Sequence, residues 1–303
     1  MAYNSPKALL KGIKADFSRL FAIEPAPVFD TVITRVKSNS DEEKYWIPES
    51  LPGVKEWKDN RHFGDFGDKY MKVTNFDWDN GLKVERNTIN DSREYLGGNV
   101  EAWVKMLTNE TKQFPDELCN ILLAANSNAF DGTAMFATSR PNIDTGSNTI
   151  NNLLTGTSSS TYSLSEFKAD FASAKSALMG FKDKGNKPFN KNPRFAVIVP
   201  AHMEDIAETL LAERQQLIYV SGTESNLYAG KASIIVNHYQ ASTDNDWYMV
   251  NVNSPFKPFL IQDRQAVQWN VWDDTKSKFV EYGLDFRMGY AFLNPFSIVK
   301  INN

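Results

Sequence analysis

Residues that carry most catalytic and metal-binding chemistry are scarce in this sequence. Its 303 residues include one cysteine, Cys119, and three histidines, His62, His202 and His238. A single cysteine excludes a disulfide within the chain, and so few sulfur and imidazole ligands supply a soft-metal site poorly. Long apolar runs are also lacking, since nothing approaches the roughly 18 consecutive apolar residues that a membrane helix requires. We therefore expect no metal cofactor and no membrane partner.

A basic surplus is missing as well. Lys and Arg number 33 and Asp and Glu number 37, which gives a formal net charge of −4. This balance argues against a dedicated nucleic-acid binder, which usually carries excess positive charge. Aromatic residues, in contrast, make up 13% of the chain and exclude disorder for most of it. The N-terminus shows no signal-peptide pattern, so we expect synthesis in a reducing, cytosolic compartment.

No catalytic motif is present. The sequence contains no nucleophile elbow, Walker loop, dinucleotide glycine fingerprint or zinc-protease helix motif. The Gly/Ser/Thr tract 155–161 lacks the lysine of a phosphate loop and is interpreted as a flexible loop. Cys119 lies in an apolar helical context typical of a buried structural thiol. His202 with Glu204 and Asp205 could hold a hard cation, although acidic residues in a first helical turn also complement the helix dipole. We predict no catalytic residue and no cofactor.

One carbohydrate-binding alternative rests on the range 244–274. Glycosidase chemistry needs two facing carboxylates, and tryptophan rings can form a sugar-stacking platform. The same residue types are common in turns beside strands and in cores. The residues concerned are Asp244, Asp246, Trp247, Trp269, Trp272, Asp273 and Asp274.

The first 21 residues predict an amphipathic helix over 5–21. Its apolar stripe recurs at spacings of three and four residues and comprises Leu9, Leu10, Ile13, Phe17 and Leu20. Its polar side carries a local positive excess from Lys7, Lys11, Lys14 and Arg19. The stripe needs another apolar surface to cover it. The sequence does not distinguish between docking on the same chain and docking on a neighbouring chain.

The range 70–89 predicts a long β-hairpin. Asp79-Asn80-Gly81 is the turn candidate, because Asn-Gly favours the positive φ angles of a type I′ turn. Trp78 and Leu82 flank this turn, and many charged residues in both arms indicate that the hairpin projects from the body.

Further helices and strands follow. Two apolar helical stripes lie on either side of Pro115, so we expect a kinked long helix or two helices that meet near Phe114. Ser163 and Glu166 form a capping box that opens a helix reaching Phe181. The continuous apolar run 195–199 and a second run at 232–236, with helices beside them, predict a sheet covered on both faces.

The end of the chain predicts one long strand. Apolar residues occupy every second position from Val280 to Phe292, a run of roughly 40 Å at about 3.3 Å per residue. Such a strand exceeds the usual length, so we expect a bend at Gly283 or Gly289. One face meets a core, and the other meets water or another subunit.

Several motifs resemble those of a known family. The stretches 43–48 and 51–61 are similar to its "Y-x-W, then P, then x-E-W-x-G-x-R" run. Residues 114–123 and 130–136 resemble its "P-D-x-L … L-L … D-G-x-x-F-F" run, and 197–200 with Ala207 resembles "V-V-P-P … A". This family is the Mu-like phage major head subunit, or T protein family, whose members are tailed-phage major capsid proteins with the Hong Kong 97 type fold.

The resemblance implies an α+β capsid fold with named parts. These are an N-terminal arm at 1–39, an extended segment and E-loop hairpin at 40–91, a P-domain with spine helix at 92–181 and 276–303, and an A-domain at 182–275. It implies self-assembly into hexamers and pentamers of an icosahedral shell around phage DNA. The implied partners are the chain itself, a scaffolding protein, a portal, a decoration protein and packaged double-stranded DNA bound without sequence preference. The implied location is the virion capsid, assembled in the bacterial host cytoplasm.

The resemblance implies no catalytic residue. The candidate site residues are instead expected to contact neighbouring subunits or DNA. The subunit contacts expected are Leu9, Ile13, Phe17, Trp78, Asp79, Asn80, Gly81 and Leu82. The charges expected to face DNA are Lys7, Lys11, Lys14 and Arg19. The alternative remains a carbohydrate-binding or carbohydrate-active virion-associated protein that uses the residues of 244–274.

Overall fold

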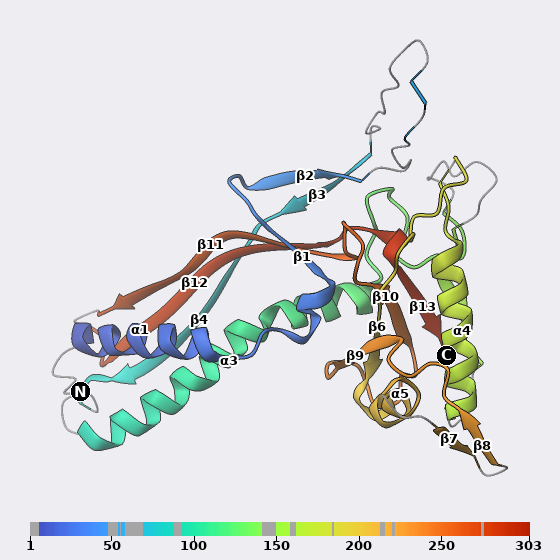
Figure 1. Ribbon diagram of the computed structural model, residues 1–303. Helices are drawn as coiled ribbons and strands as arrows, with labels where there is room; N and C mark the ends of the chain where they lie inside the picture. The colour runs from blue at the N-terminus through green and yellow to red at the C-terminus, as the bar shows by residue number, and fades with distance from the viewer. Residues whose placement is uncertain are drawn as a thin grey trace.

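The computed structural model (Figure 1) describes the following residues: 6–47, 54, 56–57, 69–87, 93–140, 150–157, 162–183, 185–212, 216–219, 222–273 and 276–303. Two sheets, each flanked by helices, occupy opposite ends of the molecule, and one long helix connects them (Figure 1). The mixture of helices and strands agrees with the predicted α+β class.

The first sheet is long and has four strands. Their order is β1 (Ile33–Lys37), β11 (Phe259–Trp272), β12 (Phe279–Phe292) and β4 (Phe76–Glu85). β12 pairs antiparallel with both β11 and β4, whereas β1 pairs parallel with β11. β4 is therefore an edge strand.

The long C-terminal strand predicted from alternation is confirmed as β12. Val280, Tyr282 and Leu284 are buried, whereas Glu281 between them is exposed. The ladder irregularities lie in the partner strand, because the β11–β12 register shifts on either side of Gln265. Extra residues in one strand of an antiparallel pair bend the sheet locally, so β11 supplies the irregularity that was expected at the β12 glycines.

Helices α1 (Pro6–Ile23) and α3 (Arg93–Ala125) cover one face of this sheet (Figure 1). The predicted N-terminal helix is thus confirmed. The two helices and the inner side of the sheet share one core, whose buried members are Ile13, Phe17, Leu20, Val84, Val104, Leu107, Val280, Tyr282, Leu284 and Phe286.

Helix α3 continues through Pro115 without a break, which excludes the expectation of two separate helices. Asp116, next to the proline, is buried, and its carboxylate accepts hydrogen bonds from the backbone N–H groups of Val28 at 2.9 Å and Phe29 at 3.0 Å. These residues begin the short helix η1 (Val28–Val32) that leads into β1. Burial raises the pKa of Asp116, although the two backbone donors oppose this shift. The C-terminal half of α3 therefore anchors the connection between α1 and the first strand.

The second sheet has five strands and is covered on both faces, as predicted. Their order is β5 (Leu153–Thr155), β13 (Ile298–Asn302), β10 (Trp247–Asn251), β6 (Phe195–Pro200) and β9 (Ala232–Asn237). Every residue of the interior strand β6 is buried. Helices α4 (Leu164–Gly180) and α5 (Glu204–Leu211) share a core with one face, while Leu118 and Leu122 of α3 share a core with the other.

The start of α4 confirms the predicted capping box. The Ser163 hydroxyl accepts a hydrogen bond from the Glu166 backbone N–H, and the Glu166 carboxylate accepts one from the Ser163 N–H at 2.7 Å. Phe167 and Phe171 follow on the buried face, so the cap fixes where this face meets the sheet.

Two short antiparallel ribbons complete the fold. β2 (Glu42–Trp46) pairs with β3 (Tyr70–Thr74), and β7 (Gln216–Tyr219) pairs with β8 (Gly222–Ser225). Figure 1 shows the β2–β3 ribbon rising away from the body on the side opposite α1 and α3. We call this pair of strands the projecting ribbon.

The hairpin predicted around Asp79-Asn80-Gly81 is wrong. These residues lie in the middle of the continuous strand β4, where Asn80 pairs with Leu284 and Gly81 pairs with Gly283. The Asn80 side chain still accepts a hydrogen bond from the Gly81 N–H at 2.7 Å, which is a local turn-like contact. The ladder to β12, however, outweighs the local preference for a turn. The antiparallel pair of strands in this part of the chain is β2–β3.

The spatial grouping also differs from the predicted ranges at two points. β11, within 182–275, lies in the same sheet as β12, within 276–303, so the boundary after 275 divides one sheet. Helix α4, within 92–181, shares its core with strands of 182–275. Sequence order could not reveal either grouping, because both depend on pairing between distant segments.

Candidate functional site

The predicted contact residues of 78–82 lie in edge strand β4 rather than at a projecting tip. Trp78 is half-buried, its indole N–H donates to the Met288 carbonyl at 3.1 Å, and its ring packs edge-on against Phe114 at 4.7 Å. Leu82 packs against the core beneath α1, whereas Asp79, Asn80 and Gly81 are exposed. Trp78 and Leu82 are thus partly buried against the chain's own core, whereas 79–81 are exposed.

The apolar stripe of α1 docks on its own chain. Ile13 is 1% exposed and Phe17 is 5% exposed. The Phe17 ring meets Trp269 of β11 edge-on at 5.2 Å. A subunit contact through Ile13 and Phe17 is therefore contradicted, because the four-stranded sheet already covers them. Leu9 has a side chain outside the described residues.

The positive side of α1 faces solvent. Lys11, Lys14 and Arg19 are exposed, and Arg19 lies 3.5 Å from Asp16 in an exposed ion pair. The side chain of Lys7 lies outside the described residues. Three of the four cations are therefore on the exposed surface of α1.

The outer face of the four-stranded sheet is polar and charged. It comprises Asp77, Asp79, Gly81, Lys83 and Glu85 of β4, which pair in that order with Arg287, Asp285, Gly283, Glu281 and Phe279 of β12. We call this set the outer face. Lys83 pairs with Glu281 at 2.7 Å, and Arg287 pairs with Asp77 at 2.7 Å. These residues alternate with the buried core residues of the same strands, so the sheet has one covered face and one open face.

A hollow lies on this outer face. It encloses about 450 Å³ and is bordered by Trp272, Asp79, Gly81, Gly283 and Asp285 among other residues. The Trp272 ring lies over Gly283, where a Cβ would come within 2.6 Å of the ring. Because neither glycine has a side chain, the floor of the hollow is backbone.

A buried hydrogen-bond chain anchors the projecting ribbon to the long sheet. Tyr45 of β2 donates its hydroxyl to Gln262 of β11 at 2.7 Å. The Gln262 amide donates to Asn75 at 2.8 Å, and the Asn75 amide donates to Ser38 at 3.1 Å. Gln262, Asn75 and Ser38 are all buried. Partial burial, followed by the charge of Glu43, raises the pKa of Tyr45 to about 12, so its hydroxyl remains a donor at neutral pH.

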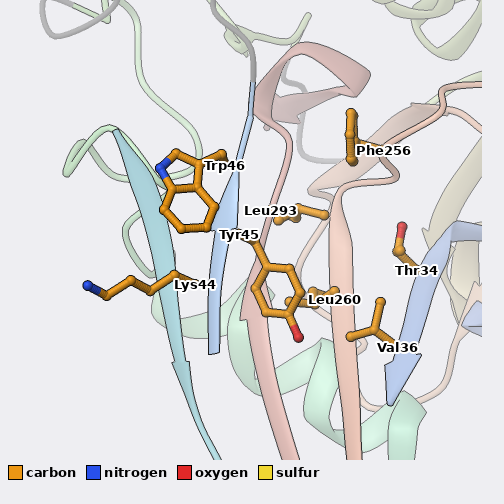
Figure 2. A pocket seen from close by; sticks show the side chains of 8 residues that line it. All are labelled: Thr34, Val36, Lys44, Tyr45, Trp46, Phe256, Leu260 and Leu293. Atoms are coloured by element: carbon orange, nitrogen blue, oxygen red, sulfur yellow. The ribbon is translucent and has the colours of Figure 1, made fainter. Parts of the chain in front are cut away.

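A second hollow of about 450 Å³ lies between the ribbon and the body (Figure 2). Figure 2 shows Tyr45 pointing inward between β2 and the body strands, whereas Lys44 points away from them. The remaining lining residues are Thr34, Val36, Trp46, Phe256, Leu260 and Leu293. Sequence reasoning missed this ribbon, and the only local signal was the alternation in the two short segments 42–46 and 70–74.

The residues of the carbohydrate alternative do not form one site. Trp247 is fully buried in β10, and its indole N–H donates to the Tyr162 hydroxyl at 3.0 Å. Trp269 and Trp272 lie on opposite faces of β11, since Trp269 meets Phe17 of α1 and Trp272 lies over the outer face. The three rings cannot form one stacking platform. Asp274 lies outside the described residues.

The acidic residues of that alternative have structural partners. Asp246 forms an ion pair with Lys300 and accepts a hydrogen bond from the Asn303 N–H at 2.9 Å. Asp244 accepts from the Asp246 N–H at 3.0 Å in a local turn, and Asp273 forms an ion pair with Arg86. This arrangement gives no support to a pair of catalytic carboxylates.

The other chemical candidates also have structural surroundings. Cys119 is buried, and burial raises the pKa of its thiol well above its usual range. His202 lies within 2.9 Å of the Asn245 side-chain oxygen. In the described part of the chain, no group of three or more His, Cys, Asp or Glu side chains is placed to hold a metal ion. Of the tract 155–161, residues 158–161 lie outside the described residues. No helix in the described ranges is both long and apolar enough to cross a membrane.

Comparison with known proteins gives one family. The family described as Mu-like prophage major head subunit gpT matches residues 7–169, which is more than half of the chain. No curated protein sequence matches the chain.

Solved structures with a similar fold come from several particles. A chain of the bacteriophage JBD30 procapsid is 17% identical, with 99% of this chain and 76% of that chain covered and a TM-score of 0.51. A chain of a virus-like particle from Pyrococcus furiosus is 11% identical, with 96% and 98% covered and a TM-score of 0.54. A chain of the native GTA particle capsid is 8% identical, with 91% and 89% covered and a TM-score of 0.58. At such low identities, these likenesses establish the fold.

Proposed function

The chain belongs to the Mu-like prophage major head subunit gpT family, and we propose that it builds the head as hexamers and pentamers of an icosahedral shell enclosing phage DNA. Its role is that of a major head subunit of a tailed phage, and its fold is the α+β capsid fold, so both sequence predictions are confirmed. The observation that carries the proposal is the family match combined with a fold likeness along almost the whole chain.

The large surface of the isolated chain supports assembly. It exposes 16850 Å². A compact monomer of 34.3 kDa would expose about 12,900 Å² by the usual scaling of area with mass. Among the described residues, the projecting ribbon and the outer face of the four-stranded sheet are exposed parts of an elongated subunit (Figure 1). Neighbouring copies would cover this surface, as expected for a subunit that is completed by its neighbours.

We assign the parts of the capsid fold as follows. The N-terminal arm contains α1, and the projecting ribbon is the base of the E-loop. Helix α3 is the spine helix, and together with the four-stranded sheet it forms the P-domain. The five-stranded sheet with α4 and α5 forms the A-domain. The ribbon overlaps an adjacent subunit.

The remaining partners follow from the same proposal. A scaffolding protein, a portal and a decoration protein complete the head, which assembles in the host cytoplasm. Packaged DNA contacts the inner surface through phosphate electrostatics without base reading, with Lys7, Lys11, Lys14 and Arg19 as the candidate charges. The role is structural and requires no catalysis.

Expression of the chain alone tests the proposal. We expect closed shells of one or a few sizes by electron microscopy and a matching fast-sedimenting species. A strictly monomeric chain at high concentration, also with the scaffolding protein present, would contradict it.

A shortened ribbon tests the assigned E-loop. Trp46 pairs with Tyr70, so the strand ends are adjacent, and residues 48–68 can be replaced by Asn-Gly. The monomer should keep its unfolding transition, whereas shells should be lost or deformed. Deleting 77–82, around the turn predicted from the sequence, removes the centre of β4 and would damage the sheet instead. Normal shells from the shortened chain would contradict the assignment.

A further inference from the structure

The outer face carries more carboxylates than cations. It has two cations, Lys83 and Arg287, and five acidic residues, Asp77, Asp79, Glu85, Glu281 and Asp285, which gives a formal net charge of −3. The Lys83–Glu281 and Arg287–Asp77 pairs neutralise part of this charge. Within the described ranges, no cation pairs with Asp79 or Asp285. Asp285 accepts hydrogen bonds from two neutral amides, those of Gln265 at 3.2 Å and Asn270 at 2.7 Å.

An exposed indole stands beside these two carboxylates. Trp272 is 54% exposed and borders the same hollow as Asp79 and Asp285. The missing side chain at Gly283 makes room for the ring, and Gly81 borders the same hollow. An aromatic face next to carboxylates attracts a cationic side chain by charge and by the ring quadrupole. Exposed aromatics are also typical anchors of protein interfaces.

The complementary charge lies on the other side of the same sheet. Helix α1 packs on the covered face of the sheet near the C-terminal end of β11. Phe17 contacts Trp269 there, and Leu10 packs against the same core as Val271. Lys11 and Lys14 are exposed on α1, and no carboxylate pairs with either of them among the described residues. Each subunit thus has an acidic surface and a basic surface on opposite sides of one sheet.

We propose that the outer face of one copy, centred on Asp79, Trp272 and Asp285, binds Lys11 and Lys14 on α1 of a second copy. This inference rests on the proposed self-assembly and names one of its contacts. Because the two surfaces differ, the contact is heterologous, and repetition of such a contact closes into a ring when the rotation allows it. Where α1 meets a neighbour, Lys11 and Lys14 are covered, and the DNA contact proposed above is left to Lys7 and Arg19.

A charge swap tests this contact in the full-length chain. Variant A carries Asp79→Lys and Asp285→Lys, variant B carries Lys11→Glu and Lys14→Glu, and variant C carries all four changes. We expect A and B each to reduce the yield of shells at least tenfold, and C to restore most of it. Variant C reverses both surfaces, so attraction returns only if these surfaces meet. Loss of DNA contact alone cannot explain such a rescue.

A matched control and a fold check accompany the swap. Asp205→Lys with Glu208→Lys changes two exposed carboxylates on α5, and this control should assemble as the wild type does. Every variant should keep the wild-type circular dichroism. Unchanged shell yield in variant A, or no recovery in variant C, would overturn the contact. If the wild-type chain itself formed no shells, the proposed self-assembly would fail instead, so the two failures are distinguishable.

Discussion

Gly289 of β12 lies against the main-chain carbonyl of Thr74 in β3, so that a Cβ at position 289 would come within 2.7 Å of that oxygen. The projecting ribbon crosses the long sheet at this point, and only a residue without a side chain permits the approach. The conflict is with backbone, which cannot rotate away. Gly289 therefore determines how closely the base of the ribbon lies on the body.

Gly289→Ala should destabilise the unassembled chain by about 1–3 kcal/mol, because overpacking against backbone forces a shift of the strand. Gly283→Ala is the matched control in the same strand. Its Cβ would meet the Trp272 ring, which can turn toward solvent, so the cost should be smaller. Urea unfolding of both variants measures the difference. Equal losses of unfolding free energy in the two variants would show that the close approach of Thr74 does not require glycine at position 289.

The raised pKa of Tyr45 predicts that the folded chain loses stability at alkaline pH. Its pKa in the folded chain is raised to about 12 from the ordinary 10.0, so the neutral phenol is favoured by folding. This contribution is complete below pH 10.0 and is lost as the pH rises through about 12. Tyr45→Phe removes the donor to Gln262 and should cost about 1–3 kcal/mol at neutral pH.

Phenolate absorbance provides the check. The difference between the alkaline titrations of wild type and Tyr45→Phe should be one transition near pH 12. A difference transition near pH 10 would show that Tyr45 titrates as an ordinary exposed tyrosine and does not anchor the ribbon.

The pair Asp131–Arg140 predicts strong coupling within the chain. The guanidinium Nη2 lies 2.6 Å from the carboxylate, and both side chains are fully buried. Arg140→Met should cost about 3–5 kcal/mol, because it leaves Asp131 charged and buried. The double variant Arg140→Met with Asp131→Leu should recover much of this loss. A double-mutant cycle by urea unfolding measures the coupling, and additive losses would contradict it.

Phe17 predicts that α1 stabilises its own subunit. The ring is 5% exposed and packs against Trp269, so Phe17→Ala should cost about 3–5 kcal/mol in the unassembled chain. Ser18→Ala, on the exposed side of α1, is the control and should change little. If Phe17→Ala left the unfolding transition of the monomer unchanged and only prevented shells, the stripe would belong to a subunit interface after all.

Local patterns predicted much of the fold. The α1 stripe, the Ser163 cap, the buried run 195–199 and the alternation of β12 each depend on residues close in sequence. Such short-range patterns predict the structure correctly when the apolar face that they define is also the face that the tertiary structure buries.

The candidate site was predictable only in part. Asn80-Gly81 favours a turn locally, but its pairing with 283–284 lies about two hundred residues away and decides the outcome. The projecting ribbon joins two strands whose pairing the sequence does not signal, since their alternation is only five residues long. The sequence predicted that one face of the long strand meets water or another subunit. The hollow on this face could not be predicted, because it depends on the pairing of Gly81 with Gly283 across two strands.

Electron microscopy of the purified full-length chain, with sedimentation on the same sample, tests the central claim most directly. We expect closed, hollow shells whose map shows the outer face of each subunit covered by a neighbour. A chain that stays monomeric at high concentration, with and without its scaffolding protein, would contradict it.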